Sequence, residues 1–489
     1  MKKEILITIL LTTFLFIGKE VFSQRQAWSF ILDDKANTKC IDLDETTIND
    51  HIITAAAFNS GSGKQFAVLL KINHEGVLND TVHITSQQTS ISPVSTYVDS
   101  NNSLTFIGLS YDTILHNNAA LIRIVFDSKL EITERKVAVL PIDLVIGGFF
   151  QSTLLSDSSV LVYATVISST SKLETTLVCH LDKYFNFLKY NIPAPNQWGT
   201  YLDMRQLNDS TFWVLQMMSP KYLKLDASFN IIGQSPIPRY FSTNSSCKWV
   251  NDSTFYLLGK NNYPLPEHNI AIVKQFHPFD TTGHLFWRWH HTDTIDFPSV
   301  YKGIDFKHPD TIFAGGTHNL DRYNPHYAHH PSWLVVLQTD SMLNLRWERF
   351  YGGDAYYVMS NLIATNDGGC LVGGWRFDYQ NSTENQTDII LLKLNSEGLL
   401  TGINNPTTIQ LREAIVYPNP GSSQLKVRLA IQHPQALFQL FDQGGRLVMQ
   451  QQLTTTESEL ETNHLTAGIY VYRITSSTGL NENGKWVKQ

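Results

Sequence analysis

Two nearly identical stretches decide the fold: Asn208–Leu215 (NDSTFWVL) and Asn251–Leu258 (NDSTFYLL). Each begins with a polar turn and continues as a short apolar and aromatic run, which predicts a tight turn followed by a buried β-strand. Asn366–Val372 (NDGGCLV) is a third version. Asn, Asp and Gly suit such turns because they tolerate a positive φ. A turn followed by a strand is therefore the repeating unit of this chain.

The same turn recurs along the body of the chain, centred on Asp50, Asn102, Asp157, Asp209, Asp252, Asp310 and Asp367. A second apolar strand and another polar turn complete each unit, as in Phe66–Asn73 before His74–Gly76. Units of roughly 43 to 58 residues built only of short strands have the size of a propeller blade. The sequence predicts an all-β protein with a seven-bladed β-propeller over residues 24–402. A β-solenoid is the alternative, although its repeats are usually shorter and more regular.

The N-terminal strand is predicted to close this ring. Several units end in a Trp-bearing strand, such as Leu345–Phe350, but the last unit lacks one, and Ala27–Leu32 stands alone near the N-terminus. Closure removes the exposed sheet edges of a ring. We therefore expect Ala27–Leu32 to complete the last blade.

The first residues have the pattern of a secretory signal peptide. Lys2 and Lys3 precede an apolar run, Ile5–Ile17, and Ser23 offers a cleavage site. A membrane-spanning helix needs roughly 20 apolar residues, and this run is shorter. We expect residues 1–23 to be a signal peptide and the mature chain not to span a membrane.

Composition excludes two further classes. Hydrophobic residues make up 42% of the chain and charged residues only 17%, so a disordered chain is excluded. The net charge is −7 and there is no basic block, so nucleic acid is excluded as a main partner. The four cysteines are widely separated, which favours isolated buried thiols within the β units over a zinc site; an exported chain would also permit disulfides.

After a linker at residues 403–414, the pattern changes to short, evenly spaced strands. Ala436–Phe441 and Ile469–Ile474 are two of them, and Asp442–Gly445 and Asn483–Gly484 supply turns. About seventy-five residues with this rhythm predict a small β-sandwich over residues 415–489.

Four blocks in this segment, Val416–Pro420, Leu440–Val448, Leu465–Ile474 and Gly484–Lys488, resemble the C-terminal (type A) sorting domain of type IX secretion cargo in Bacteroidota. The resemblance implies that the outer-membrane type IX machinery reads this domain, and that the body is then tethered to the outer cell surface or released. The body resembles secreted β-propeller repeat proteins only in the spacing of its turns and strands. The sorting motif residues are Tyr417, Pro418, Asn419, Pro420, Asp442, Gly445, Gly468, Tyr470 and Lys485.

No catalytic motif is present, so the sequence predicts no catalytic residue and no cofactor. His326, His329 and His330 are the candidate metal ligands, since clustered imidazoles can bind Zn²⁺ or Cu²⁺. Pro325 and the neighbouring turn residues favour a solvated loop instead. The alternating acids of Asp42–Glu45 could serve Ca²⁺, but the other loop positions do not follow, and we interpret this stretch as a turn.

Aromatic residues in the expected loops could stack on sugar rings: Trp198, Tyr263, Tyr323, Tyr327, Trp375 and Tyr379. The preferred hypothesis is a non-enzymatic binding or adhesion propeller for a glycan or a protein. The alternatives are an extracellular glycan hydrolase or lyase, which needs two converging carboxylates, and a structural surface protein with an apolar, plugged channel.

Overall fold

A computed structural model gives the structure of the chain. It describes residues 27–32, 37–59, 63–86, 88–112, 119–140, 145–167, 174–194, 200–217, 221–237, 241–261, 269–280, 285–288, 295–381, 386–400, 414–417, 421–429, 435–455, 457–477 and 481–489. The regular elements in this part of the chain are all β-strands, and no helix there has the length and apolar character needed to cross a membrane. The predicted signal peptide and most of the predicted linker lie outside the described residues. The chain divides into two units, 1–408 and 409–489.

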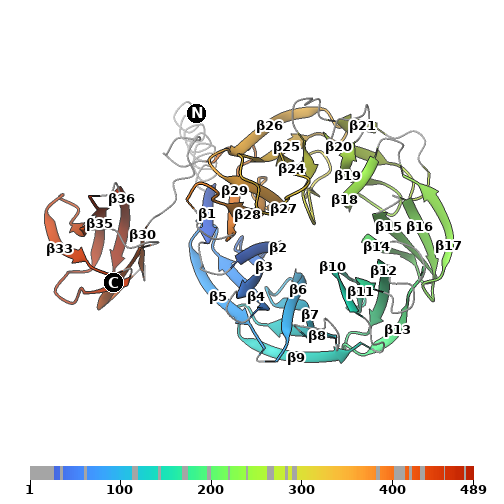
Figure 1. Ribbon diagram of the computed structural model, residues 1–489, viewed down its shortest axis with the longest axis horizontal. Coiled ribbons are helices and arrows are strands. Elements are labelled where there is room, and N and C mark those ends of the chain that lie inside the picture. Colours follow the sequence, from blue (N-terminus) through green and yellow to red (C-terminus); the bar gives the residue numbers. More distant parts are fainter. Residues whose placement is uncertain are drawn as a thin grey trace, which may run out of the picture. The chain divides into compact units, whose positions relative to one another are not determined.

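The first unit is a ring of antiparallel sheets in which β2, β6, β10, β14, β18 and β27 are innermost strands, nearest the axis (Figure 1). Over the described residues there are seven such sheets, as the sequence predicted. The first three blades are β2 (Asn37–Glu45), β3 (His51–Asn59), β4 (Lys64–Ile72) and β5 (Leu78–Ile84); β6 (Ser90–Val98), β7 (Leu104–Tyr111), β8 (Ala120–Phe126) and β9 (Ile132–Val139); and β10 (Val145–Leu154), β11 (Val160–Ile167), β12 (Glu174–Leu181) and β13 (Phe187–Asn191).

The remaining blades follow in the same order around the ring. They are β14 (Thr200–Asn208), β15 (Thr211–Met217), β16 (Lys221–Asp226) and β17 (Ile231–Pro236); β18 (Phe241–Trp249), β19 (Phe255–Asn261), β20 (Asn269–Gln275) and β21 (Leu285–Arg288); β22 (Phe297–Pro298), β23 (Ile304–Asp305), β24 (Ile312–His318), β25 (Trp333–Thr339) and β26 (Leu345–Gly352); and β27 (Tyr356–Ala364), β28 (Cys370–Phe377), β29 (Asp388–Leu394) and β1 (Trp28–Leu32). The inner strand of the sixth blade is thus divided into two short pieces, β22 and β23.

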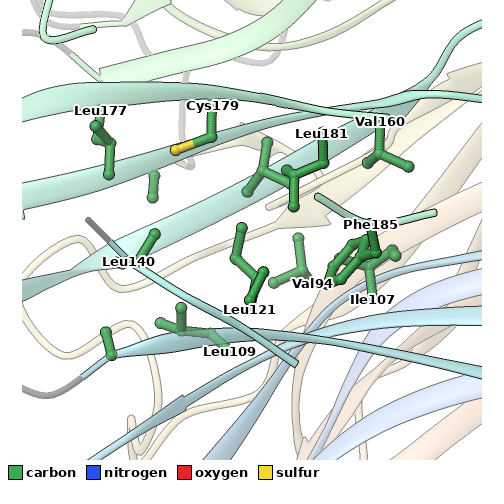
Figure 2. Packing of buried hydrophobic residues seen from close by; sticks show 14 of the residues in the cluster. Val94, Ile107, Leu109, Leu121, Leu140, Val160, Leu177, Cys179, Leu181 and Phe185 are labelled. Atoms are coloured by element: carbon green, nitrogen blue, oxygen red, sulfur yellow. The ribbon is translucent and has the colours of Figure 1, made fainter. Parts of the chain in front are cut away.

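Apolar side chains of adjacent blades meet face to face and form the core between them. Between the second and third blades, Ile107 and Leu121 lie opposite Val160, Leu181 and other buried residues (Figure 2). Strands buried on both faces read as continuous apolar runs, and β29 is one, with Ile389, Ile390, Leu391 and Leu392 all fully buried. Blade-to-blade packing is therefore the main source of cohesion in the ring.

The turn that follows the third strand has the same chemistry in several blades. In the second blade, Oδ1 of Asp127 accepts hydrogen bonds from the backbone N–H groups of Lys129 and Glu131, both at 2.9 Å. Equivalent bonds are made by Asn73, Asp182, Asp226, Asp340 and Asn395. The fourth residue of each turn has a positive φ: Gly76, Leu130, Phe185, Phe229, Leu343 and Gly398. A side chain that hydrogen-bonds its own turn explains why the repeat shows Asn or Asp here.

The N-terminal strand completes the last blade, which confirms the sequence prediction. β1 pairs antiparallel with β29, with Trp28 opposite Lys393 and Leu32 opposite Ile389. Trp28, Phe30 and Leu32 pack against the core between the seventh and first blades. Figure 1 shows β1 beside β29, next to the first blade. The ring is therefore closed by a strand from the opposite end of the propeller sequence.

Where the fourth turn residue is glycine, a tryptophan of the preceding blade takes the place of its side chain. Trp28 covers Gly76 and Trp347 covers Gly398, and a Cβ on either glycine would lie 2.6 Å from an indole carbon. Each indole N–H also donates to the carbonyl two residues before the glycine, at 3.2 and 3.0 Å respectively. In the other turns the fourth side chain is itself buried, as in Leu130, Phe185, Phe229 and Leu343. At these two places a Trp-bearing outer strand thus faces a Gly-bearing turn.

Two glycine substitutions test this match. Gly368→Ala places a Cβ at φ +85° with no atom within 4 Å, so only backbone strain opposes it, about 1 kcal/mol. Gly398→Ala, at φ +72°, adds a collision with Trp347. We expect Gly398→Ala to destabilise the chain by about 1–3 kcal/mol more than Gly368→Ala, measured by denaturant unfolding. Equal losses for the two variants would contradict the packing role of Trp347.

The second unit is a β-sandwich, as predicted. One sheet contains β30 (Ala414–Tyr417), β31 (Gln424–Leu429) and β34 (Glu457–Glu461), and the other has the order β33 (Leu447–Leu453), β32 (Ala436–Phe441), β35 (Gly468–Thr475) and β36 (Asn481–Lys488). Their inner faces share one apolar core that includes Phe438, Tyr472 and Trp486. The sequence analysis missed β34, because its acidic residues alternate with only two others, Ser458 and Leu460.

Candidate functional site

Carboxylates on the innermost strands form the most unusual polar arrangement in the propeller. The prediction of a turn at Asp42–Glu45 is wrong, since these residues belong to β2. Alternating acids on a strand point to one face, and here the next blade satisfies them. Oδ2 of Asp42 accepts the backbone N–H of Thr96 at 3.0 Å, and Oδ2 of Asp44 accepts that of Val98 at 2.9 Å. Both donors lie on β6, so the acids join the first two blades.

Lys302 reaches Asp42 from the sixth blade, past the inner strand of the seventh. It follows β22, in a segment that hydrogen-bonds along β27, and its Nζ lies 2.8 Å from Oδ1 of Asp42. Its side chain is 43% exposed, whereas that of Asp42 is 2% exposed. Burial opposes the charge of Lys302, but Asp42 favours it, and the net effect is a raised pKa. The ammonium also favours the ionised forms of Asp44 and Asp203, which places it among acids of separate blades.

Two further inner-strand carboxylates bridge other blades. Oδ2 of Asp203 on β14 accepts the thiol of Cys247 on β18 at 2.9 Å, and burial raises the pKa of this carboxyl. Oδ2 of Asp305 on β23 accepts the backbone N–H of Ala364 on β27 at 2.9 Å, and its Oδ1 lies 2.6 Å from Nζ of Lys248. The centre of the ring therefore combines charged groups with an aromatic contact, since the ring of Phe149 on β10 lies 6.1 Å from that of Tyr301 in the sixth blade.

Each of these four carboxylates has both oxygens engaged. Oδ1 of Asp42 also accepts from Leu43, that of Asp44 from Glu45 and that of Asp203 from Met204. A general acid or base needs an oxygen within hydrogen-bond reach of substrate. These carboxylates are instead committed to backbone groups, a thiol and ammonium groups. The arrangement holds blades together around the axis.

Asp44 differs from its neighbours in its proton affinity. Burial, with the charge of Asp42 in second place, raises the pKa of this carboxyl to about 6. The folded chain therefore binds the proton of Asp44 more tightly than the unfolded chain does. Stability from this group is highest below the unfolded pKa, near 4, and falls as pH rises to about 6.

The pH dependence of Asp44→Asn tests this assignment. Asparagine does not ionise, so the variant lacks the decrease in folding stability that ionisation of Asp44 causes in the wild type between about pH 4 and pH 7. We expect the stability of the wild type relative to Asp44→Asn to fall by about 3 kcal/mol across this range. Denaturant unfolding of both chains at several pH values measures the difference. A constant difference would show that Asp44 titrates normally.

The candidate metal ligands lie in the loop between β24 and β25, which has no helical turn among the described residues. Each ring packs on a different aromatic residue: His326 on Trp375 at 5.6 Å, His329 on Phe377 at 5.5 Å and His330 on Tyr356 at 5.5 Å. Burial and nearby Lys39 lower the pKa of His326 to about 4. Nowhere in the described ranges do three His, Cys, Asp or Glu side chains gather to hold a metal ion.

The aromatic candidates divide by exposure. Tyr323 is 84% exposed, and the guanidinium of Arg322 lies 4.5 Å from its ring centre and donates to its hydroxyl at 2.6 Å. Tyr327 and Tyr379 are half-buried against a small core that includes buried Trp375. Trp198 and Tyr263 lie outside the described residues. Tyr323 is therefore the candidate available for stacking on a ligand.

The cysteines are free thiols on four different strands: Cys40, Cys179, Cys247 and Cys370. Three are buried, as expected, but Cys247, whose thiol donates to Asp203, is only partly buried.

The predicted sorting motif residues mostly build the C-terminal sandwich. Tyr470 is buried, its hydroxyl donates to the carbonyl of Thr466 at 2.7 Å, and its ring lies 5.9 Å from that of Trp486. Oδ1 of Asp442 accepts the N–H groups of the turn that contains Gly445, whose φ is +78°. Gly468 begins β35, and Lys485 is exposed on β36. Tyr417 ends β30, and Pro418, Asn419 and Pro420 lie outside the described residues.

Residues 415–489 match the family model described as the secretion system C-terminal sorting domain. The C-terminal unit is a secretion system C-terminal sorting domain. The sorting domain directs the chain to the type IX secretion machinery, and the protein is secreted or attached to the cell surface. The resemblance of the four sequence blocks is thus confirmed.

Known structures are similar to the chain at low identity. A fungal alcohol oxidase of the AA5 family, in complex with copper, is 10% identical with a TM-score of 0.49, covering 95% of this chain and 100% of that one. YCF48 from Cyanidioschyzon merolae is 9% identical with a TM-score of 0.42, covering 76% and 99%. PorZ, a surface component of the type IX system of Porphyromonas gingivalis, is 9% identical with a TM-score of 0.24, covering 91% and 75%. No curated protein matches the chain.

Sequence reasoning missed Lys302, Asp203 and Asp305 outside the sorting domain. Asp203 has a recognisable signal, because it stands between the apolar residues Leu202 and Met204 of β14. Lys302 has none, since its position depends on the division of the sixth inner strand.

Proposed function

We propose that the propeller is a binding module for a glycan or a protein, which the sorting domain brings to the outer cell surface or the medium. The observation that carries this proposal is the commitment of the axial carboxylates to the neighbouring blades. They stabilise the ring and leave no pair of carboxyl groups free for hydrolysis. A rigid ring of this kind presents its loops to a ligand.

The loop between β24 and β25 supplies the contact surface. Its base packs on the seventh blade through Ala328 and Tyr327, and Oδ1 of Asp321 accepts the backbone N–H of Tyr323 at 2.8 Å. Tyr323 and Arg322 then form a flat, amphipathic pair on a fixed base. Such a pair can stack on a sugar ring or on a protein side chain and hydrogen-bond its polar groups.

A glycan array probed with the purified full chain tests the proposal, with retention and product release scored separately. Retention without products is expected. Tyr323→Ala should lower retention about tenfold, the loss typical of a contact residue at the centre of an interface. Tyr184→Ala is the matched control, since Tyr184 is 63% exposed on the third blade. Release of shorter sugars, or equal loss in both variants, would contradict the proposal.

A glycan hydrolase is the second candidate; the pKa of Asp44 favours it, and the reaction would require a substrate to displace one of the hydrogen bonds that this carboxylate accepts. A carboxyl with a pKa of about 6 is in the range of a general acid, and Asp42 lies two residues away on the same strand. Product release that disappears in Asp44→Asn, while retention persists, would replace binding by hydrolysis.

A further inference from the structure

The sorting domain has one apolar outer face. Its exposed large apolar side chains among the described residues are Leu447, Ile469 and Val471, which are 44%, 46% and 43% exposed. All three lie on the four-stranded sheet, where Tyr470 and Tyr472 alternate with Ile469 and Val471 and point into the core. The three exposed residues therefore lie on the face that turns away from the core.

Strand register makes these side chains neighbours. Phe441 on β32 is opposite both Leu447 on β33 and Val471 on β35. Ile469 is opposite Val487 on β36. Directly opposed side chains on one face lie about 5 Å apart. Leu447, Phe441 and Val471 thus form a line across β33, β32 and β35, and Ile469 and Val487 extend it to β36 two residues further along; we call this set the apolar row. Contiguous apolar surface of this kind marks an interaction site.

Cations border the apolar row on β35 and β36, whereas its other end adjoins the ion pair between Arg446 and Asp442, at 3.1 Å. Val471 is opposite Lys485, and the next outward residue of β35 is Arg473; both cations are exposed. An apolar row bordered by cations is complementary to a protein groove with an apolar floor and carboxylates on its rim.

One of the sorting motif residues is exposed on this face. Tyr470 is in the core, and Asp442 and Gly445 build a turn, so these residues shape the sandwich. A partner that reads the folded domain contacts what is exposed. Lys485, the motif residue that is exposed on β36, borders the apolar row.

We infer that the outer face of β33, β32, β35 and β36 is the surface by which the type IX machinery binds the sorting domain. The partner is a protein groove with an apolar floor and acidic groups opposite Arg473 and Lys485. The inference rests on the export role of the domain and adds the face that performs it. Ile469 and Val471 are the central contacts, and the cations fix the orientation.

Export of full-length variants in a host with a type IX system tests the inference. Ile469→Thr combined with Val471→Thr keeps β-branched residues on the strand and changes exposed positions, so the fold should persist. We expect about tenfold less protein at the surface and in the medium, with folded protein accumulating in the periplasm. Val137→Thr combined with Val139→Thr is the matched control, because both residues are exposed on β9 of the propeller, at 56% and 70%.

Two further chains make the result interpretable. Arg473→Glu combined with Lys485→Glu should also lower export, without changing the melting temperature. Removal of residues 409–489 should abolish export. If that chain is still exported, the export role itself fails; if it is retained while the Ile469 and Val471 variant is exported normally, only the docking face is wrong. Binding of the purified wild type, but not of that variant, to vesicles of phosphatidylglycerol would assign the face to a lipid and overturn the inference.

Discussion

A chain without residues 24–36 is expected to melt about 6 °C below the intact chain. Removing β1 exposes the edge of β29 and withdraws Trp28, Phe30 and Leu32 from the core between the seventh and first blades. At about 1.5 kcal/mol for each partly buried side chain, the loss is near 5 kcal/mol. With the entropy of unfolding usual for a domain of this size, that loss corresponds to about 6 °C. Differential scanning calorimetry of the two chains measures it.

Trp347→Ala is the matched comparison for this deletion. Trp347 covers Gly398 as Trp28 covers Gly76, but it belongs to a blade whose strands are consecutive in sequence. Removal of the Trp347 indole should abolish its contact with Gly398 but leave the ring closed. Addition of a peptide with the sequence of residues 24–36 should restore the melting temperature of the shortened chain. An unchanged melt after the deletion would show that the ring does not depend on β1.

A chain that ends at residue 408 is expected to fold its propeller and to remain in the periplasm. The two units have separate cores, so removal of the second leaves the buried residues of the first in place. Export depends on the sorting domain, which lies entirely in the lost part. Fractionation of cells into periplasm, surface and medium, with calorimetry of the retained protein, measures both results. A propeller that fails to melt cooperatively without its partner would contradict the independence of the two units.

Local chemistry explains why much of the fold could be predicted from the sequence. The Asn and Asp residues of the turns hydrogen-bond the backbone within four residues, so their signal does not depend on distant parts of the chain. The closing strand was also predictable, because Ala27–Leu32 has the Trp that the last unit lacks.

The axial arrangement could not be predicted, because each of its contacts crosses between blades. Asp42 and Asp44 are satisfied by β6, and an isolated strand with alternating acids gives no sign of such donors. The partner of Asp42 is Lys302, which comes from the sixth blade. For the same reason the metal hypothesis at His326 had a local signal, the clustered imidazoles, but the rings pack on separate aromatic residues.

The pairing of β1 with β29 joins the first strand of the propeller to its last internal strand. During synthesis β1 has no pairing partner until β29, the last strand of the propeller to be translated, has been made. The sorting domain is translated after it. A chain cut short at any blade therefore lacks both its closing partner and its export address. Because the sorting domain is translated last, a chain that carries it also contains every strand of the propeller. Export through this domain is thereby restricted to chains with a complete propeller.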